Sequence, residues 1–188
     1  MKTTDINNKF AACFFAGILS TVLLFSFTQV NADPITPELQ TKVEKYKLKL
    51  VEWVKNPIIL DAIRQANANG SLAGMNNAKW DDLKDDAPEV RALITSAAGK
   101  VLVNLESDKS ISKLYIRDFK GNLVAGSNKP LLFNNSTRPQ YLSPIKGQVF
   151  SANEAKPDPT TSIMGVQIAA PIMDGDKVIG VINSSVNQ

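Results

Sequence analysis

Histidine is absent from this chain of 188 residues, and its single cysteine, Cys13, lies close to the N-terminus. Without histidine there is no imidazole to act as a general base or to ligate haem, and nearly all zinc sites are excluded as well. A lone cysteine cannot form a disulfide within the chain. We therefore expect no metal, no cofactor and no catalytic residue, and the protein is not expected to be an enzyme.

Aromatic residues and net charge are also scarce. Aromatics make up 7% of the chain, and 21 Lys and Arg against 18 Asp and Glu leave a net charge of +3. The basic residues are spread along the whole length, without the clustered patch that binds nucleic acid, so we expect no nucleic-acid partner. A hydrophobic content of 44% is sufficient for one globular domain with its own core.

The N-terminal segment has the pattern of a secretory signal. Lys2 and Lys9 precede an uncharged apolar run at 10–27, and a small residue occupies the cleavage position at its end. We predict a signal peptide at 1–32, a single domain at 33–188 and a periplasmic location. The alternative is an uncleaved N-terminal helix that anchors the chain in a membrane.

A long helix is expected at the start of the domain. Thr36 is a favourable N-cap, Pro37 suits the first helical position, and Asn56 before Pro57 should end or kink the helix. Apolar residues recur between these signals at four-three spacing: Leu39, Val43, Tyr46, Leu50 and Trp53. This stripe can pack on the domain's own sheet, or it can form the seam of a homodimer or of a contact with a partner helix.

Shorter helices and two β-hairpins are expected in the rest of the domain. The helices are predicted at 58–66, at 76–84 and from 85 to about 106, where Gly99 weakens the last one by about 1 kcal/mol of helix propensity. The strands are predicted at 112–118, 123–125, 164–172 and 177–186, with Asp, Gly and Asn in the two turns. The pattern indicates an α+β fold with one antiparallel sheet covered by helices. The segment at 130–159 is expected to be a long loop with a functional role.

Three segments, in their order and spacing, resemble the Cache family of extracellular sensor domains. They are 54–58 at the end of the long helix, 115–124 across the first hairpin and 170–181 across the second. The resemblance covers 37–186. It implies a stand-alone sensor domain in which a PAS-like antiparallel sheet follows a long N-terminal helix, with shorter helices packed on it and a small ligand bound.

The segment between the hairpins is similar to the amino-acid-binding signature of that family. Arg138 and Tyr141 match positions that the family uses to hold a ligand carboxylate. Phe133 lacks the phenolic hydroxyl of the family's aromatic residue, and Gln140 replaces a tryptophan that covers the ligand. Asp158 is the candidate for holding a ligand ammonium, without a matching motif. The resemblance therefore implies a carboxylate ligand, and the two departures argue against an α-amino acid.

Three more side chains are candidates on their own chemistry. Tyr115 and Arg117 share one face of their strand, so both point into a pocket or both point into water. For Arg117 the alternative to ligand contact is a surface salt bridge. Trp80 can cover a ligand or can belong to the core.

Together these observations predict an exported, non-catalytic sensor domain that binds a small organic acid or an amino acid. Because the chain ends at its last predicted strand, we expect the signal to pass through a separate membrane-bound receptor or signalling protein. The alternative is a structural or protein-interaction module of the periplasm, with no small-molecule ligand.

Overall fold

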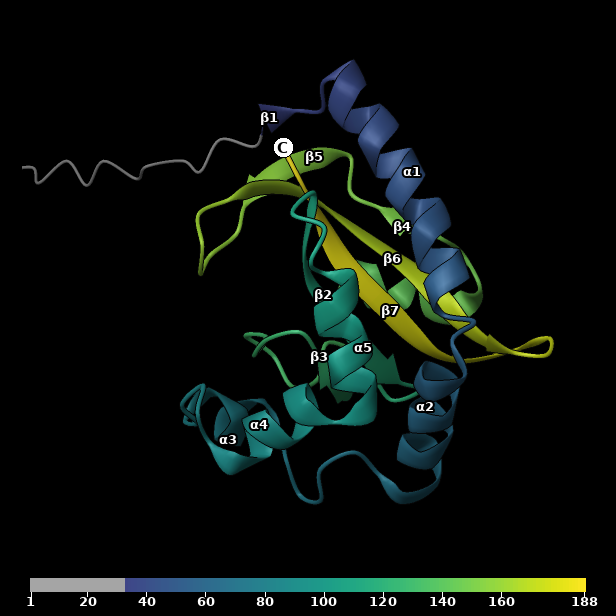
Figure 1. Cartoon of the computed structure of the whole chain (residues 1–188), viewed down its shortest axis with the longest axis vertical. Coiled ribbons are helices and arrows are strands. Elements are labelled where there is room, and N and C mark those ends of the chain that lie inside the picture. The colour runs from purple at the N-terminus through teal and green to yellow at the C-terminus, as the bar shows by residue number, and fades with distance from the viewer. Residues whose placement is uncertain (1–32) are drawn as a thin grey trace, which may run out of the picture. The chain divides into compact units, whose positions relative to one another are not determined.

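The computed structural model describes residues 33–188, so the predicted signal peptide lies outside the described residues. In this part of the chain the helices precede most of the strands (Figure 1). The helices are α1 (Pro37–Trp53), α2 (Pro57–Asn69), α3 (Asn77–Asp81), α4 (Pro88–Thr95), α5 (Ala97–Leu105), α6 (Pro139–Leu142) and the short 3₁₀ helix η1 (Pro144–Lys146). The strands are β1 (Asp33–Pro34), β2 (Ile111–Asp118), β3 (Leu123–Gly126), β4 (Phe150–Ser151), β5 (Glu154–Pro157), β6 (Met164–Asp174) and β7 (Lys177–Asn187).

The strands form one antiparallel sheet with the order β1-β5-β6-β7-β2-β3, and β4 pairs with β6 beside β5. Both predicted hairpins are present, because β2 pairs with β3 and β6 pairs with β7. The pairing of β7 with β2 joins the two hairpins at the centre of the sheet. The prediction of an α+β fold with a PAS-like antiparallel sheet is therefore confirmed.

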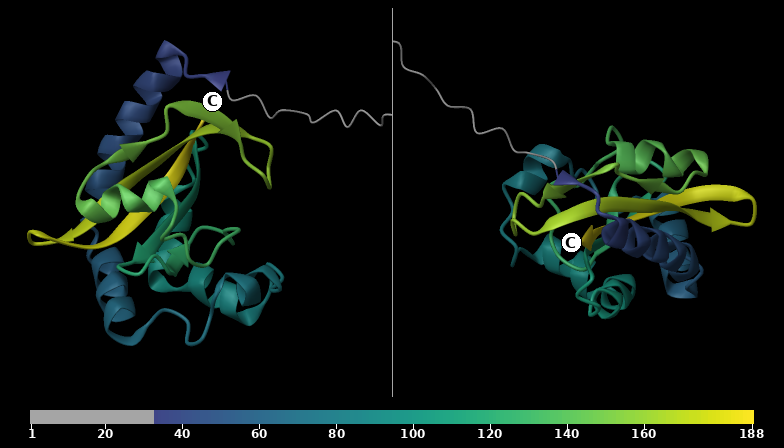
Figure 2. Two further views of the ribbon diagram at one scale, coloured as in Figure 1. Left: turned by 180° about the vertical axis from the view of Figure 1, so that it is seen from behind. Right: turned by 90° about the horizontal axis from the view of Figure 1, so that it is seen from above.

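The long helix α1 covers one face of the sheet. Thr36 accepts a hydrogen bond from the backbone N–H of Leu39 at 3.2 Å and so caps the helix as predicted. The apolar stripe packs into the main core with β6 and β7: Leu39, Val43, Tyr46 and Leu50 are all buried. Figure 2 shows α1 on one side of these strands and α6 on the other. The core-facing alternative is correct for this stripe, and dimerisation through the helix stays a prediction.

One helix predicted from 85 to about 106 is wrong, because the chain breaks between α4 and α5. Ser96 has an extended backbone, with ψ at 163°, and its hydroxyl accepts the backbone N–H of Gly99 at 2.9 Å. Ser96 therefore ends α4 and caps α5. A Cβ on Gly99 would lie 2.2 Å from the carbonyl oxygen of Ile94, so this close turn requires glycine.

Gly99→Ala is expected to lower the free energy of unfolding by about 3 kcal/mol, because the added methyl group meets backbone atoms that cannot move independently. Thermal denaturation of the domain at 33–188 measures this loss. Asn104→Ala, on the exposed side of the same helix, is the control and should leave stability unchanged or slightly raised. Equal stability of the two variants would show that the turn can widen at no cost.

The long loop predicted at 130–159 is also corrected. This segment contains α6 and η1, which pack on β6 and β7 from the side opposite α1, and β4 and β5, which pair with β6 within the sheet. The elements are only two to four residues long, too short to give a periodic pattern in the sequence.

Candidate functional site

The face of the sheet opposite α1 is polar at its centre. Alternation along β2 and β7 assigns Tyr115, Arg117, Val181, Asn183 and Ser185 to this face, which we call the second face. All five are buried, the polar ones at 2% to 6% of their accessible area. A strand position with a polar side chain this deeply buried needs hydrogen-bond partners. Polar atoms of these residues that find no hydrogen-bond partner within the protein are the ones that a ligand could bind.

The guanidinium of Arg117 is bound only to neutral backbone oxygens. Its Nη1 donates to the carbonyl of Phe133 at 2.7 Å and, less closely, to that of Gly121 at 3.3 Å. Its Nη2 donates to the carbonyl of Leu132 at 3.1 Å. The Nε atom is buried and has no partner. Arg117 thus ties β2 to the segment that follows β3, and its buried Nε–H remains free.

Arg117 forms no ion pair within residues 33–188, and the buried carboxylate of Asp118 acts on the pKa of Arg117 only through space. The neighbouring Asp118 accepts hydrogen bonds from the backbone N–H groups of Lys120 and Asn122 and from the Asn122 side chain. Burial lowers the pKa of Arg117 to about 10, so the group still carries its charge at neutral pH. The alternative of a surface salt bridge at Arg117 is wrong, because the side chain is 2% exposed.

Two further buried atoms in the domain lack partners. They are the Oδ1 atoms of Asn135 and Asn183. Asn183 lies opposite Tyr115 in the sheet, and Val181, two residues before it, lies opposite Arg117. Asn135 lies two residues after Phe133, whose carbonyl oxygen accepts a hydrogen bond from Arg117. An unbonded donor and two unbonded acceptors in the interior each call for a partner, which a bound ligand or an ordered water can supply.

Trp80, Tyr115 and Phe133 are brought together in one apolar cluster beside Arg117. Trp80 is fully buried, its ring lies 5.6 Å from that of Phe133, and its Nε1 donates to the carbonyl of Pro130 at 2.8 Å. The guanidinium carbon of Arg117 lies 5.9 Å from the centre of the Tyr115 ring. In this arrangement Trp80 is a core residue, and the ligand contacts predicted for these aromatic residues stay predictions.

Tyr141 and Arg138 differ in exposure, and their joint contact with a ligand stays a prediction. Tyr141 is buried, and its hydroxyl donates to the carbonyl of Phe119 at 2.6 Å. Burial, with Asp118 next, raises the pKa of Tyr141 to about 12, although Arg117 acts in the opposite direction. Arg138 precedes α6 and is exposed, with no side-chain hydrogen bond to residues 33–188. Arg138 is the N-cap residue of α6 and has an extended backbone, so the helical repeat that buries Tyr141 does not fix where its side chain points.

Gln140 and Asp158 lie outside the cluster. Gln140 is half-buried on α6. Asp158, just after β5, forms an ion pair with Lys113, and its Oδ1 accepts the backbone N–H groups of Thr160 and Thr161. Burial works to raise the pKa of Asp158, but the hydrogen bonds from Lys113 and Thr160 outweigh it and hold the pKa well below its usual range. The contacts of these two residues with a ligand stay predictions.

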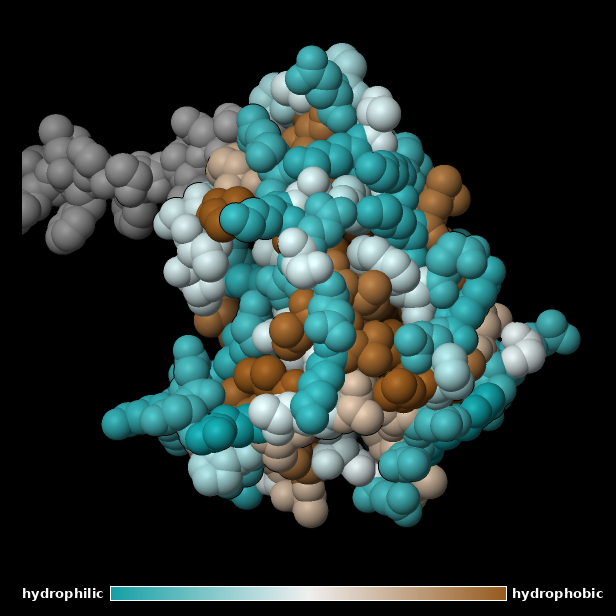
Figure 3. All heavy atoms as spheres, viewed as in Figure 1, coloured by the Kyte–Doolittle hydropathy of each residue, from teal (hydrophilic) through white to brown (hydrophobic). Residues whose placement is uncertain are grey.

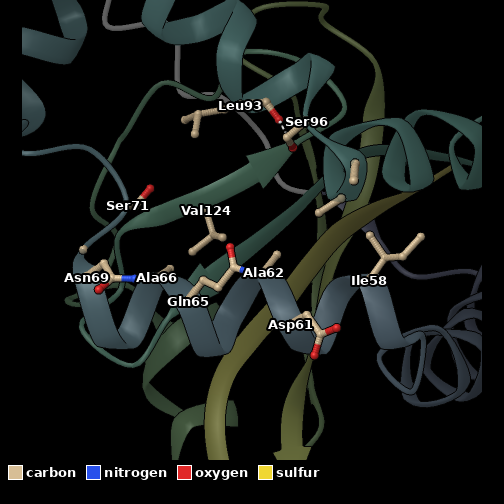
Figure 4. A pocket seen from close by; sticks show the side chains of 13 residues that line it. Ile58, Asp61, Ala62, Gln65, Ala66, Asn69, Ser71, Leu93, Ser96 and Val124 are labelled. Atoms are coloured by element: carbon tan, nitrogen blue, oxygen red, sulfur yellow. Dashed lines mark hydrogen bonds between the residues drawn. The ribbon is translucent and has the colours of Figure 1, made fainter.

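Two open grooves lie elsewhere on the domain. One, of about 590 Å³, lies between α2, β3 and the α4–α5 turn, and in Figure 4 Gln65 of α2 and Val124 of β3 face each other across it. The other, of about 800 Å³, lies between the end of α2, the β2–β3 turn and the start of β7. Neither is lined by Arg117, Arg138 or Tyr141.

The described part of the chain also bears on metals and membranes. Residues 33–188 contain no group of three or more acidic residues arranged to hold a metal ion. Among the same residues, no helix has the length and the apolar composition needed to span a bilayer.

No protein-family model matches the chain, and no curated protein matches its sequence. Among solved structures, the sensor domain of the histidine kinase DctB of V. cholerae is similar to it with 18% identity and a TM-score of 0.41, over 80% of this chain and 57% of that one. The ligand-binding domain of the Campylobacter jejuni chemoreceptor Tlp3, in complex with L-valine, is similar with 17% identity and a TM-score of 0.42, over 81% and 64%. The chain therefore spans less than two thirds of these two domains.

The sensor domain of E. coli DcuS gives a further match, with 10% identity and a TM-score of 0.43, over 78% of this chain and 92% of that one. Each of the three is described as a sensor or ligand-binding domain.

Proposed function

We propose that the domain is a non-catalytic sensor that binds a small organic anion at Arg117, on the second face of the sheet. The observation that carries this proposal is the buried guanidinium that faces only neutral carbonyl oxygens and keeps a free Nε–H. A buried charge without a directly bonded ion-pair partner is costly, and a carboxylate from solution relieves that cost. A carboxylate also matches the planar fork of donors that arginine presents.

A ligand that reaches Arg117 has to displace the elements that cover the second face. They are α6 and η1, of four and three residues, and they are followed by the two-residue strand β4 at the edge of β6. Small displacements of such elements cost less than opening the main core, because they break few apolar contacts. Binding at Arg117 therefore changes how this cover packs on the sheet, and a membrane-bound partner reads that change.

Titration of the domain at 33–188 with a panel of organic acids and amino acids, followed by calorimetry, tests the proposal. At least one organic acid should bind, and Arg117→Met should weaken its binding by about tenfold to a hundredfold, since one charged hydrogen bond contributes about 1.5–3 kcal/mol. Arg138→Ala is the control for the position predicted from the sequence. A bound acid that is lost with Arg138→Ala and retained with Arg117→Met would move the site to the N-terminus of α6 and refute the proposal.

A second candidate function, a protein-interaction module, is favoured by the apolar surface next to the first groove. Ile58 of α2 and Val103 of α5 are 42% and 43% exposed. Figure 3 shows apolar side chains gathered around these helices. Capture of a partner from a periplasmic extract distinguishes the two functions. A sensor should capture its partner differently with and without the anion, whereas an interaction module should capture it equally in both conditions.

A further inference from the structure

The turn between β2 and β3 is bonded to two different helices at a single residue, Phe119. Its backbone N–H donates to the Oδ1 atom of Asn67 on α2 at 2.9 Å. Its carbonyl oxygen accepts a hydrogen bond from the hydroxyl of Tyr141 on α6 at 2.6 Å. The side chain of Phe119 contributes little to this attachment, since it is 53% exposed. The backbone of Phe119 therefore joins α2 to α6.

These two helices lie on opposite faces of the sheet. Ile63 on α2 belongs to the core cluster of α1, and a Cβ added to Gly180 of β7 would lie 3.1 Å from the Cγ2 atom of Ile63. Tyr141 on α6 packs in a cluster with Val181, the next residue of β7. Since successive residues of a strand point to opposite faces, β7 separates the two helices. A displacement of α6 therefore reaches α2 through the sheet or around its end, where Phe119 lies.

Asn67 lies where the pairing of β2 with β7 ends. The last pair of that ladder is Asp118 with Gly180. Phe119 and Ile179 come next on the two strands, and the side-chain amide of Asn67 bonds to both. Its Nδ2 atom donates to the carbonyl of Ile179 at 2.7 Å, while its Oδ1 atom accepts from Phe119. A side-chain amide offers the same donor and acceptor as a peptide group, so Asn67 continues the ladder and ties both strands to α2.

The same turn is bonded to Arg117. The Nη1 atom of Arg117 donates to the carbonyl of Gly121 at 3.3 Å. The Tyr141 hydroxyl lies 3.5 Å from the carbonyl oxygen of Asp118, the residue that follows Arg117. The carboxylate of Asp118 accepts two backbone N–H groups of the turn and so holds it together as one unit. A displacement at Arg117 or at Tyr141 therefore moves the whole turn, including its bond to Asn67.

We infer that Asn67 is a positioning residue: it carries a displacement of α6 on the second face, through the backbone of Phe119, to α2. The inference rests on the proposed function, in which an anion reaches Arg117 by displacing α6. That displacement draws the Tyr141 hydroxyl away from the Phe119 carbonyl, the turn shifts, and Asn67 passes the shift to α2. Asn67 and Phe119 both line the groove of about 800 Å³ at the end of α2, so the shape of this groove changes with occupancy.

NMR titration of the domain at 33–188 tests the inference, with acetate, lactate, succinate and citrate as probes. The acid that binds most tightly should shift the backbone amides at 64–69, at the end of α2, with the same affinity as the Nε–H resonance of Arg117. Asn67→Leu keeps the size of the side chain but removes both of its hydrogen bonds, so the α2 shifts should fall at least threefold while Arg117 still responds. Asn69→Leu is the matched control, because Asn69 is exposed on the same helix and lines the same groove.

Tyr141→Phe tests the other end of this route. The substitution keeps the ring and removes the hydrogen bond to the Phe119 carbonyl, which the bound state has to break. The acid should therefore bind about twofold to tenfold more tightly to this variant, the factor that corresponds to one hydrogen bond. Weaker binding would make Tyr141 a direct ligand contact and would overturn the inference.

The outcomes separate the inference from the function on which it rests. If an acid binds and moves the Arg117 resonance, while the α2 amides stay in place or respond equally in Asn67→Leu, the inference is wrong and the anion site stands. If none of the four acids binds, both are wrong. If Asn67→Leu does not fold, the affinity of Tyr141→Phe alone decides the question.

Discussion

Replacement of Trp80 with alanine is expected to lower the free energy of unfolding by about 4 kcal/mol, the largest loss anticipated for a single side chain here. Trp80 is fully buried on the five-residue helix α3, in contact with Phe133. So short a helix has no stability of its own, and Trp80 is its one buried residue, with two hydrogen bonds between Asn77 and Asn134 as a further tie. For a domain of this size the loss corresponds to a fall of about 12 °C in the melting temperature.

Two variants separate the contributions to this loss. Trp80→Phe keeps most of the apolar volume and removes only the hydrogen bond to Pro130, so it should cost about 1–2 kcal/mol. Trp53→Ala, at the end of α1, removes the chain's other tryptophan from a half-buried position and should cost less than Trp80→Ala. Should Trp80→Ala and Trp53→Ala prove equally stable, α3 would not depend on the ring, and a covering role for Trp80 would regain support.

Arg117→Lys is expected to lower the free energy of unfolding by about 2 kcal/mol even though the charge is kept. One ammonium group cannot reproduce the planar fork that reaches the carbonyls of Phe133 and Leu132 together. The buried carbonyls that lose their donor then cost stability. The segment after β3 should loosen locally, because Arg117 supplies two of the bonds that tie it to β2.

Hydrogen exchange locates this second effect. Faster exchange in Arg117→Lys should be concentrated in residues 127–138, with β6 and β7 still protected. Lys120→Arg, on the adjacent turn, is the control, since the Lys120 side chain forms no ion pair within residues 33–188. Uniformly faster exchange across the sheet would instead assign Arg117 a global structural role, without a local one at the site.

The main architecture could be predicted because local patterns and tertiary packing agree. The stripe on α1, the cap at Thr36 and the two hairpins all appear in the sequence as periodicity or turn residues, and each is present. The break at Ser96 could not be predicted, since the apolar period continues through it. Only the approach of Gly99 to the backbone of Ile94 requires the break, and that contact exists only in the folded chain.

The candidate site was predicted less well, for a reason that is also physical. Sequence similarity drew attention to Arg138 and Tyr141, but the four-residue helix α6 buries only Tyr141, while Arg138 stands at its N-terminus and is exposed. Asp158 forms an ion pair with Lys113, and the sequence did not predict this pair. The left-handed backbone of Lys113 cannot be inferred from the residue being a lysine. Asn183 carried a weak signal, as an amide that follows five apolar or small residues, 178–182, in a buried strand.

The central claim is that the Nε–H of Arg117 is free for an anion. Nitrogen-15 NMR of the arginine side chains, recorded while an organic acid is added to the domain at 33–188, tests it most directly. The account predicts that the Arg117 Nε–H resonance shifts and saturates with the same affinity as the calorimetric titration, while that of Arg138 stays in place. An acid that binds and leaves the Arg117 resonance unmoved would contradict it.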